Sequence, residues 1–401
     1  MKITKNRIVQ VDALRGIALF GILLAHMVFW YNAGPLPNDL YKNQDIASNI
    51  IAGLNEILIA GKFFAFFSFL FGLSFFLQMQ SMEKTQLNFV WRYAWRIIIL
   101  GIIGLIHHAF WQGDILSIYA PLGILLIPMR KLSNKAILII GILFAINVPT
   151  RIIEIVNILL PKGLSFSQPM NWEAMSKPYY HIMSEAGWKE LIAYNWHALN
   201  TKFQFQYSSG RIFITFGFFL LGMYTGRKGW FNNTVEFSFT YKRICKTASF
   251  IMLACFLTAI SMFAADHFLK LGWQQNPYIG FVFTSFYDTF NAALVIVYIS
   301  GLTILMNKSN WQKMLFPFST VGKMALSCYI TQTIFGLMVF YHVGFGLVGK
   351  TQAWQNWLMA IAFFGVQSLF CYYWLKKYHY GPLEWLWRSA TYFKWQPFRK
   401  N

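Results

Sequence analysis

Three ionisable side chains stand in the first long apolar segment of the chain: Asp12, Arg15 and His26. Arg15 and His26 are eleven residues apart, which in an α-helix is about three turns and roughly 16 Å along nearly the same stripe. Asp12 lies one turn before Arg15, where the two side chains can pair. Ionisable groups at membrane depth are costly and usually mark function. The alternative is a structural ion pair at the helix end, with His26 as an interior hydrogen bonder.

A second set of candidate catalytic residues consists of two adjacent histidines, His107 and His108, and the acid Asp114 a few residues later. The stretch between them contains Gly113, where a turn can fold Asp114 back towards the histidines. A carboxylate that accepts a hydrogen bond from one imidazole nitrogen fixes the tautomer and leaves the other nitrogen free as a general base. Adjacent residues point about 100° apart on a helix, so we expect only one histidine to face Asp114. Asp114 can also cap the following helix, and the two roles are compatible.

Arg211 and His342 are candidates for binding a substrate. Arg211 begins an apolar segment directly after Ser208, Ser209 and Gly210, and it can clamp an anion or serve only as a helix-end charge. His342 ends another apolar segment. The histidines show no pair at i, i+4 spacing, and adjacent histidines do not both ligate a metal readily. We therefore predict no metal site and no tightly bound cofactor.

The elements that position these residues are predicted to be membrane helices. The 401-residue chain is 57% hydrophobic and only 12% charged, with a mean hydropathy of +0.45, whereas soluble proteins are about a quarter charged. Long apolar runs recur from end to end, and the alternating segments of a transmembrane barrel are absent. We predict an all-α, polytopic transmembrane bundle in which residues 1–401 form a single integral membrane domain.

Windows of roughly twenty apolar residues predict about ten spans. They lie near residues 11–31, 61–79, 93–111, 114–129, 135–158, 211–226, 246–267, 280–306, 324–345 and 354–375.

The formal charge of +20 comes from short basic clusters between the apolar runs. If successive spans cross the membrane in opposite directions, most of the 34 Lys and Arg residues fall on the same side. The positive-inside rule assigns this side to the cytoplasm. This pattern predicts that both termini are cytoplasmic, that the partner surface is a bilayer with an anionic inner leaflet, and that nucleic acid is not bound.

The sequence also predicts the structure of several segments between and within the spans. Residues 46–60 are interpreted as an interfacial approach to the second span, and 159–210 as an extracytoplasmic loop with short amphipathic helices. Gly222 and Gly226 form a GxxxG pair that favours close helix packing. Residues 381–397 predict an interfacial C-terminal helix, because Pro and Glu stand at its start.

Several of these motifs together resemble the YeiB-like family, catalogued as domain of unknown function 418. They are DALRG at 12–16, KFFAFFSFLFG at 62–72, LIH at 105–107 with WQGDIL at 111–116, GKMALSCY at 322–329 with FYH at 340–342, and GPLEWLWR at 381–388. The resemblance covers nearly the whole chain. It implies a multi-pass protein of the bacterial inner membrane.

The first segment is also similar to that of the transmembrane acyltransferases, which acylate glycans and other acceptors at the outer face. In their acyltransferase-three group an arginine precedes a catalytic histidine by ten intervening residues, a pattern met here by Arg15 and His26. The resemblance implies transfer of an acyl group from acyl-CoA to a glycan or lipid-linked acceptor. In this hypothesis His26 or His107 is the general base, Asp114 orients the imidazole, and Arg15 with Asp12 positions the donor. The alternatives are a transporter of a small metabolite or peptide, or a membrane scaffold.

Overall fold

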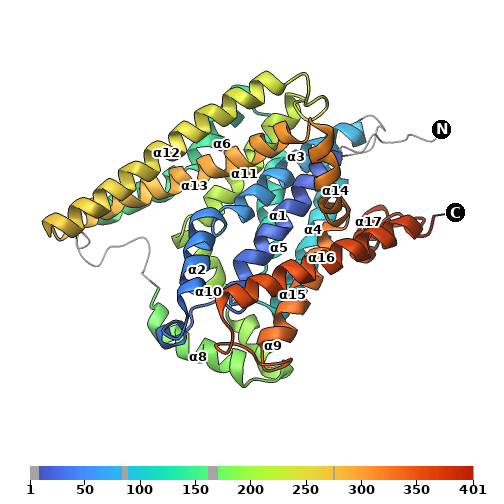
Figure 1. Ribbon diagram of the computed structural model, residues 1–401. Coiled ribbons are helices and arrows are strands. Elements are labelled where there is room, and N and C mark those ends of the chain that lie inside the picture. Colours follow the sequence, from blue (N-terminus) through green and yellow to red (C-terminus); the bar gives the residue numbers. More distant parts are fainter. Residues whose placement is uncertain (1–8, 84–88, 161–169, 274–275, 401) are drawn as a thin grey trace.

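The computed structural model describes residues 9–83, 89–160, 170–273 and 276–400, and within these ranges the chain is almost entirely helical. Figure 1 shows the helices gathered into one bundle. Some predictions fall outside the described residues. They concern the basic residues Lys2, Lys5, Arg7 and Lys84 and the part of the predicted loop at 161–169. The elements are α1 (Val9–Met27), η1 (Asn38–Tyr41), α2 (Ile46–Leu58), α3 (Phe63–Glu83), α4 (Phe89–Phe110), α5 (Leu116–Met129), α6 (Asn134–Ala145), α7 (Val148–Leu159), α8 (Trp172–Ser184), α9 (Trp188–His197), α10 (Leu199–Ser208), α11 (Arg211–Arg227), α12 (Ser238–Leu269), α13 (Pro277–Leu305), α14 (Ser309–Lys323), α15 (Ala325–Phe340), α16 (Ala353–Lys377) and α17 (Pro382–Tyr392).

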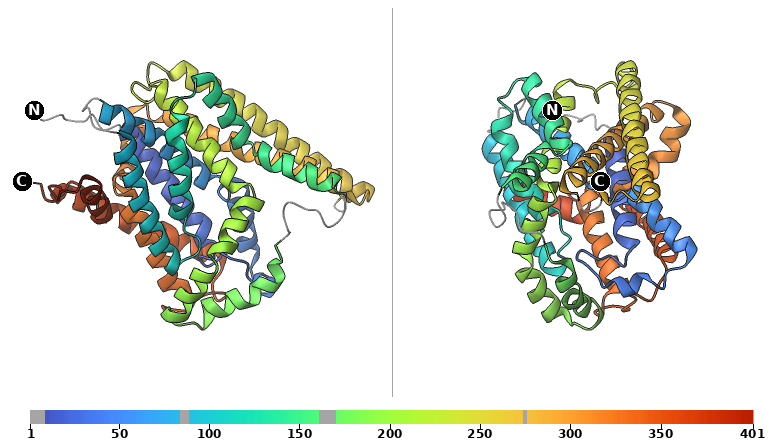
Figure 2. Two further views of the ribbon diagram at one scale, coloured as in Figure 1. Left: turned by 180° about the vertical axis from the view of Figure 1, so that it is seen from behind. Right: turned by 90° about the vertical axis from the view of Figure 1, so that its left-hand side faces the viewer.

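The predicted all-helical, polytopic membrane architecture is confirmed. Among the described residues six helices are long and apolar enough to cross a membrane, or up to eight if each of two bent pairs is one span. Every predicted range contains a helix, but α5 has 14 residues and α11 has 17. The number of about ten spans and the side on which the termini lie stay predictions. In Figures 1 and 2 the start of α1 and α17 lie at one end of the bundle, and α8 and α9 at the other.

The predicted span 135–158 is not one straight helix. It is divided into α6 and α7, which meet at an angle of 53°. Asn147, between them, has the left-handed φ of 63°. Pro149 follows at the start of α7, where its ring and missing N–H prevent α6 from continuing through this point. The Asn147 side chain then donates to Asp288 Oδ2 of α13 at 2.9 Å.

A sharper bend of 85° separates α14 from α15. The first backbone N–H groups of α15 have no acceptor within the helix. A carboxylate from α17 accepts from two of them. Glu384 of α17 accepts from the backbone N–H groups of Leu326 and Ser327 at 2.6 and 3.0 Å, and from the Ser327 hydroxyl at 2.6 Å.

The predicted loop 159–210 contains three short helices, α8, α9 and α10. The predicted C-terminal helix ends earlier than expected, at Tyr392 instead of residue 397. Phe393 has a left-handed φ of 52°, and the chain then turns back so that His379 N–H donates to the Phe398 carbonyl at 2.9 Å. The segment at 46–60 forms α2, whose apolar side chains Ile46, Ile50 and Leu54 are exposed.

Glycines allow the closest helix contacts in the bundle. A Cβ built on Gly222 of α11 would lie 1.9 Å from the Phe69 carbonyl oxygen of α3, and one on Gly226 would meet the Phe76 ring at 2.7 Å. The close-packing interpretation of this GxxxG pair is therefore confirmed. In the same way, a Cβ built on Gly16 of α1 would overlap the Phe318 carbonyl oxygen of α14, and one on Gly322 of α14 would overlap the Asp12 carbonyl oxygen of α1.

We expect Gly222→Ala to lower the free energy of unfolding by about 1–3 kcal/mol, because the new methyl group overlaps backbone that must move. Thermal unfolding of the detergent-solubilised protein measures the effect. Gly365→Ala is the matched control, since a Cβ at this position of α16 meets nothing within 4 Å. Equal midpoints for the two variants would contradict the packing role of Gly222.

Candidate functional site

A buried histidine–aspartate pair lies at the turn between α4 and α5. His107 is in the last turn of α4, and Asp114 Oδ1 lies 2.8 Å from its Nδ1. A carboxylate can only accept, so Nδ1 of His107 carries the hydrogen and Nε2 is left as an acceptor. Nε2 is buried and has no hydrogen-bond partner among the described residues. The turn at Gly113 thus brings together the two residues that the sequence suggested.

Asp114 also caps α5, so the cap that the sequence suggested is present together with the contact to His107. Its Oδ1 accepts from the Leu116 N–H at 3.1 Å, and its Oδ2 accepts from the Ser117 N–H at 2.8 Å. Side-chain caps of this kind satisfy amides that the helix cannot. The cap and the histidine contact together fix the orientation of the carboxylate.

Lys202 of α10 approaches the same carboxylate, and sequence reasoning missed it. Its Nζ lies 3.5 Å from Asp114 Oδ2, 2.7 Å from Ser117 Oγ and 3.3 Å from His108 Nδ1. His108 Nε2 lies 2.8 Å from the Asn195 carbonyl oxygen, so it is the donor, and Nδ1 accepts from Lys202. His108 therefore faces α9 and α10, and only His107 of the two histidines contacts Asp114.

His26 lies close to this pair, separated from it by one aromatic side chain. The Trp111 ring centroid is 4.8 Å from that of His26 and 5.9 Å from that of His107. His26 is half-buried, whereas His107 is buried. We call His26, His107, His108, Asp114 and Lys202 the histidine cluster.

Tyrosines that the sequence did not single out surround the histidine cluster. The Tyr329 ring centroid lies 5.0 Å from that of His107, and its hydroxyl accepts from the Ile115 N–H at 3.2 Å. The hydroxyls of Tyr179 and Tyr341 are 2.9 Å apart. Burial raises the pKa of Tyr179 above its ordinary value, so its hydroxyl stays neutral.

Asp12 and Arg15 form the predicted pair, but at the other end of α1. Arg15 Nη1 donates to Asp12 Oδ1 at 2.9 Å, and Nη2 donates to Ser74 Oγ of α3 at 2.6 Å. Three turns of helix separate this pair from His26. The two groups of candidates therefore lie at different depths of the same helix.

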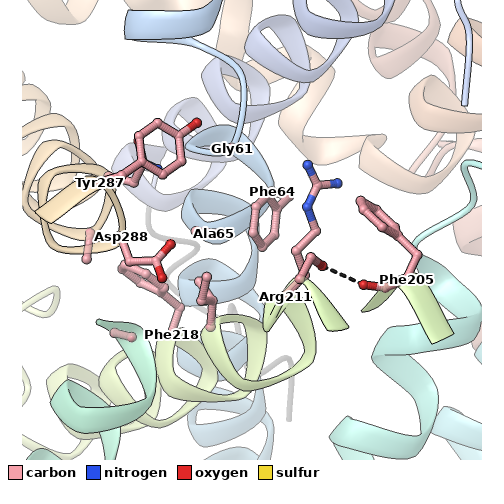
Figure 3. Close-up of a pocket in the computed structure, with 13 residues that line it drawn as sticks. Gly61, Phe64, Ala65, Phe205, Arg211, Phe218, Tyr287 and Asp288 are labelled. Atoms are coloured by element: carbon pink, nitrogen blue, oxygen red, sulfur yellow. Dashed lines mark hydrogen bonds between the residues drawn. The ribbon is translucent and has the colours of Figure 1, made fainter. Parts of the chain in front are cut away.

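The structure does not bring Arg211 and His342 into direct contact with the histidine cluster. Arg211 lines a cavity of about 210 Å³ together with Phe64, Phe205 and Asp288 (Figure 3), and it lies within electrostatic reach of His26. His342 is exposed, and its backbone N–H donates to the Met183 carbonyl at 2.7 Å. In the described part of the chain, no group of three or more His, Cys, Asp and Glu side chains could hold a metal ion.

Fold and site define a multi-helix membrane protein that carries a buried histidine–aspartate pair between two of its helices. A family model described as "Protein of unknown function (DUF418)" matches residues 225–394. The Bacillus subtilis (strain 168) protein "Uncharacterized protein YxaH" is 29% identical over 100% of this chain and 98% of its own length. The Escherichia coli (strain K12) protein "Uncharacterized protein YeiB" is 26% identical over 96% of each chain. The match over residues 225–394 and the likeness to YxaH and YeiB over nearly the whole chain support a YeiB-like DUF418 family.

A third relative, "Uncharacterized 39.9 kDa protein in amylase 3'region" from Bacillus acidopullulyticus, is 27% identical over 96% of this chain and 94% of its own. No solved structure matches the chain. The region matched by the family model begins after the histidine cluster and Arg211, whereas the three relatives extend through both.

We expect the Asp114 carboxylate to stabilise the folded protein by about 2 kcal/mol at neutral pH. Burial alone would raise its pKa, but the hydrogen bond from His107 and the charge of Lys202 outweigh burial and lower the pKa from 3.8 to about 2. Because the folded-state pKa lies below the ordinary one, this contribution is complete above about pH 3.8 and is lost as the pH falls towards 2.

The measurement is the free energy of unfolding of the wild type and of Asp114→Asn between pH 6 and pH 2.5, with exposed Glu190→Gln of α9 as control. The difference between wild type and Asp114→Asn should shrink as the solution becomes acidic. A difference that stays constant across this window would show that Asp114 does not titrate as described.

Proposed function

We propose that this protein is an acyltransferase of the bacterial inner membrane. It would move an acyl group from a cytoplasmic thioester donor, such as acyl-CoA, to a hydroxyl or amine of a glycan or lipid-linked acceptor at the outer face. The observation that carries the proposal is the 2.8 Å contact between His107 Nδ1 and Asp114 Oδ1, which leaves Nε2 of a buried imidazole without a partner in the described residues. An imidazole held in this tautomer is suited to act as a general base.

In the proposed reaction Nε2 of His107 takes the proton from the acceptor hydroxyl or amine. The acceptor oxygen or nitrogen then attacks the thioester carbonyl carbon, and the resulting tetrahedral intermediate collapses with cleavage of the carbon–sulfur bond. The leaving thiolate takes up the proton from the imidazolium, so the products are the acylated acceptor and the free thiol. The Asp114 carboxylate stabilises the imidazolium between these two proton transfers.

Lys202 and His26 have supporting roles in this proposal. Lys202 holds Asp114 Oδ2 and Ser117 Oγ, so it positions the carboxylate without contacting His107 directly. His26 lies across Trp111 from His107 and is half-buried, which supports a direct contact with substrate. It is the second candidate for the base, and single variants separate the two histidines.

Arg15 would act on the donor side. Its pairing with Asp12 and Ser74 holds it three turns away from His26, at the end of α1 that begins the chain. A donor bound there must extend its thioester roughly 16 Å along α1 to reach the histidines. The two groups on one helix are therefore consistent with a donor and an acceptor that approach from opposite sides.

A transporter is the second candidate, and the bent helix pairs favour it. Interrupted helices at membrane depth are typical of substrate sites in secondary transporters. The 53° break at Asn147 places an amide next to Asp288 and Arg151, which pair at 3.1 Å. This network lies on the other side of the Arg211 cavity from Phe64 and Phe205, as Figure 3 shows for Asp288.

We expect His107→Ala to lower the rate of thioester turnover by about 10²–10⁴-fold, the usual contribution of a general base. Asp114→Asn should lower it through the loss of the imidazolium's charge partner. The assay uses the purified full-length protein in detergent with radiolabelled acyl-CoA and a total envelope extract as the source of acceptor. Exposed His379→Ala, at the other end of the bundle, is the control and should keep the wild-type rate.

The same turnover assay with the His26→Ala variant shows which histidine is the general base. Loss of turnover in His26→Ala with retention in His107→Ala would move the role of base to His26. The acyltransferase proposal is overturned if the wild type neither binds nor turns over the thioester. Counterflow of a labelled solute in liposomes would then support the transporter.

A further inference from the structure

The cavity beside the start of α11 is lined by the guanidinium of Arg211, which no acceptor in the described part of the chain contacts. The cavity has a volume of about 210 Å³, which is about seven times the volume that one water molecule occupies in the liquid. It lies between helices far apart in the sequence, and its lining includes Phe64 and Ala65 of α3, Phe205 of α10, Arg211 of α11 and Asp288 of α13. It is separate from the histidine cluster, whose members do not line it.

The guanidinium of Arg211 is held between two aromatic rings. Its central carbon is 5.3 Å from the Phe64 ring centroid and 4.9 Å from the Phe205 ring centroid. Figure 3 shows the group turned towards these rings and away from Asp288. The Arg211 side chain has no hydrogen bond or ion pair with any residue in the ranges that the structure describes. Aromatic contacts occupy the faces of the guanidinium, and its edge carries the N–H groups that remain unsatisfied.

The nearest acids of the cavity already have partners of their own. Asp288 Oδ2 lies 3.1 Å from Arg151 Nη2 and accepts from Asn147 Nδ2 at 2.9 Å. The Glu56 carboxylate accepts from the Tyr287 hydroxyl at 2.8 Å. Arg151 is shared between Asp288 and Glu154. Glu56 attracts Arg211 electrostatically, but neither Asp288 nor Glu56 forms an ion pair with the guanidinium in the described part of the chain. The half-buried guanidinium therefore keeps N–H donors that no acceptor among the described residues contacts, and a ligand with acceptor oxygens matches them.

The local backbone adds to this preference for an anion. Arg211 is the first residue of α11, and Ser209 and Ile214 line the same cavity, so the amino end of the helix faces it. The unsatisfied N–H groups and the dipole at this end favour negative charge. Gly210 allows the start of α11 to lie close to Asn147. Its φ is +71°, and a Cβ at this position would lie 2.2 Å from the Asn147 side chain.

We infer that this cavity binds an oxyanion, a carboxylate or phosphate group, through the edge of the Arg211 guanidinium. Guanidinium matches both groups with two parallel hydrogen bonds, and the apolar lining from Phe64, Ala65 and Phe218 suits the carbon atoms that adjoin the anionic group. The ligand is either a small free anion or the anionic end of a larger molecule. If the proposed function holds, this group belongs to the acceptor, and that assignment rests on the proposed function whereas the binding itself does not.

The test is thermal unfolding of the purified full-length protein, followed by tryptophan fluorescence, with sodium phosphate, sodium succinate and glycerol phosphate as probes against sodium chloride at equal ionic strength. A second arm compares short-chain phosphatidylglycerol with phosphatidylcholine. We expect at least one oxyanion to raise the unfolding midpoint of the wild type. Arg211→Gln should weaken its apparent affinity by about tenfold to a hundredfold, as expected for the loss of charge-assisted hydrogen bonds.

Two control variants keep the result interpretable. Lys228→Gln removes an exposed cation at the other end of α11, which also lies over an aromatic ring, and it should respond to the probes like the wild type. His107→Asn should also bind the probes normally, because His107 does not line the cavity. If Arg211→Gln lowers the basal midpoint, the change in midpoint with probe concentration still reports binding.

The outcomes separate the two proposals. A probe-dependent shift that disappears only in Arg211→Gln supports the inference even if no thioester turnover is found. A shift with free anions assigns the site to a small solute, and a shift confined to phosphatidylglycerol assigns it to a lipid headgroup. An equal response of wild type and Arg211→Gln, or no response of the wild type to any of these probes, overturns the inference even if acyl transfer is observed.

Discussion

The end of the bundle that carries α8 and α9 depends on one buried carboxylate that accepts from several donors at once. Asp114 receives the His107 imidazole, the first two amides of α5 and the ammonium of Lys202. A buried carboxylate is costly unless such partners surround it. With them it joins three segments, the end of α4, the start of α5 and the middle of α10. The same contacts that hold these helices together also fix the tautomer of His107, so structure and chemistry share one residue.

Arg211 represents the opposite electrostatic situation in the same molecule. Asp114 is saturated with donors from the protein, whereas the guanidinium of Arg211 has aromatic neighbours but no acceptor among the described residues. The first arrangement is complete without a ligand and the second is not. This contrast is the physical reason for assigning proton transfer to the histidine cluster and ligand binding to the cavity.

Much of the fold and part of the site could be predicted from the sequence, for reasons that differ by residue. Hydropathy located the helices because lipid-facing segments must be continuously apolar, and the short distances from Asp12 to Arg15 and from His107 to Asp114 are set by local geometry. The bend at Asn147 was missed because apolar residues flank it on both sides and only Pro149 signals it. Lys202 and Tyr329 were missed because their contacts with residues 114–117 join segments more than eighty residues apart, which no local pattern reveals. His342 was predicted to bind substrate from its place at the end of an apolar segment, but that place does not determine which way the side chain points.

Glu384 gives the final segment of the chain an importance that its position near the end would not suggest. The carboxylate of this residue supplies acceptors to the first turn of α15, directly after the 85° bend, and the Trp387 indole of the same helix donates to the Arg96 carbonyl of α4 at 2.8 Å. Truncating the protein before Gly381 would expose two amides in the interior and detach a support of α4. Fragments that stop at α16 are therefore unsuitable for biochemical work.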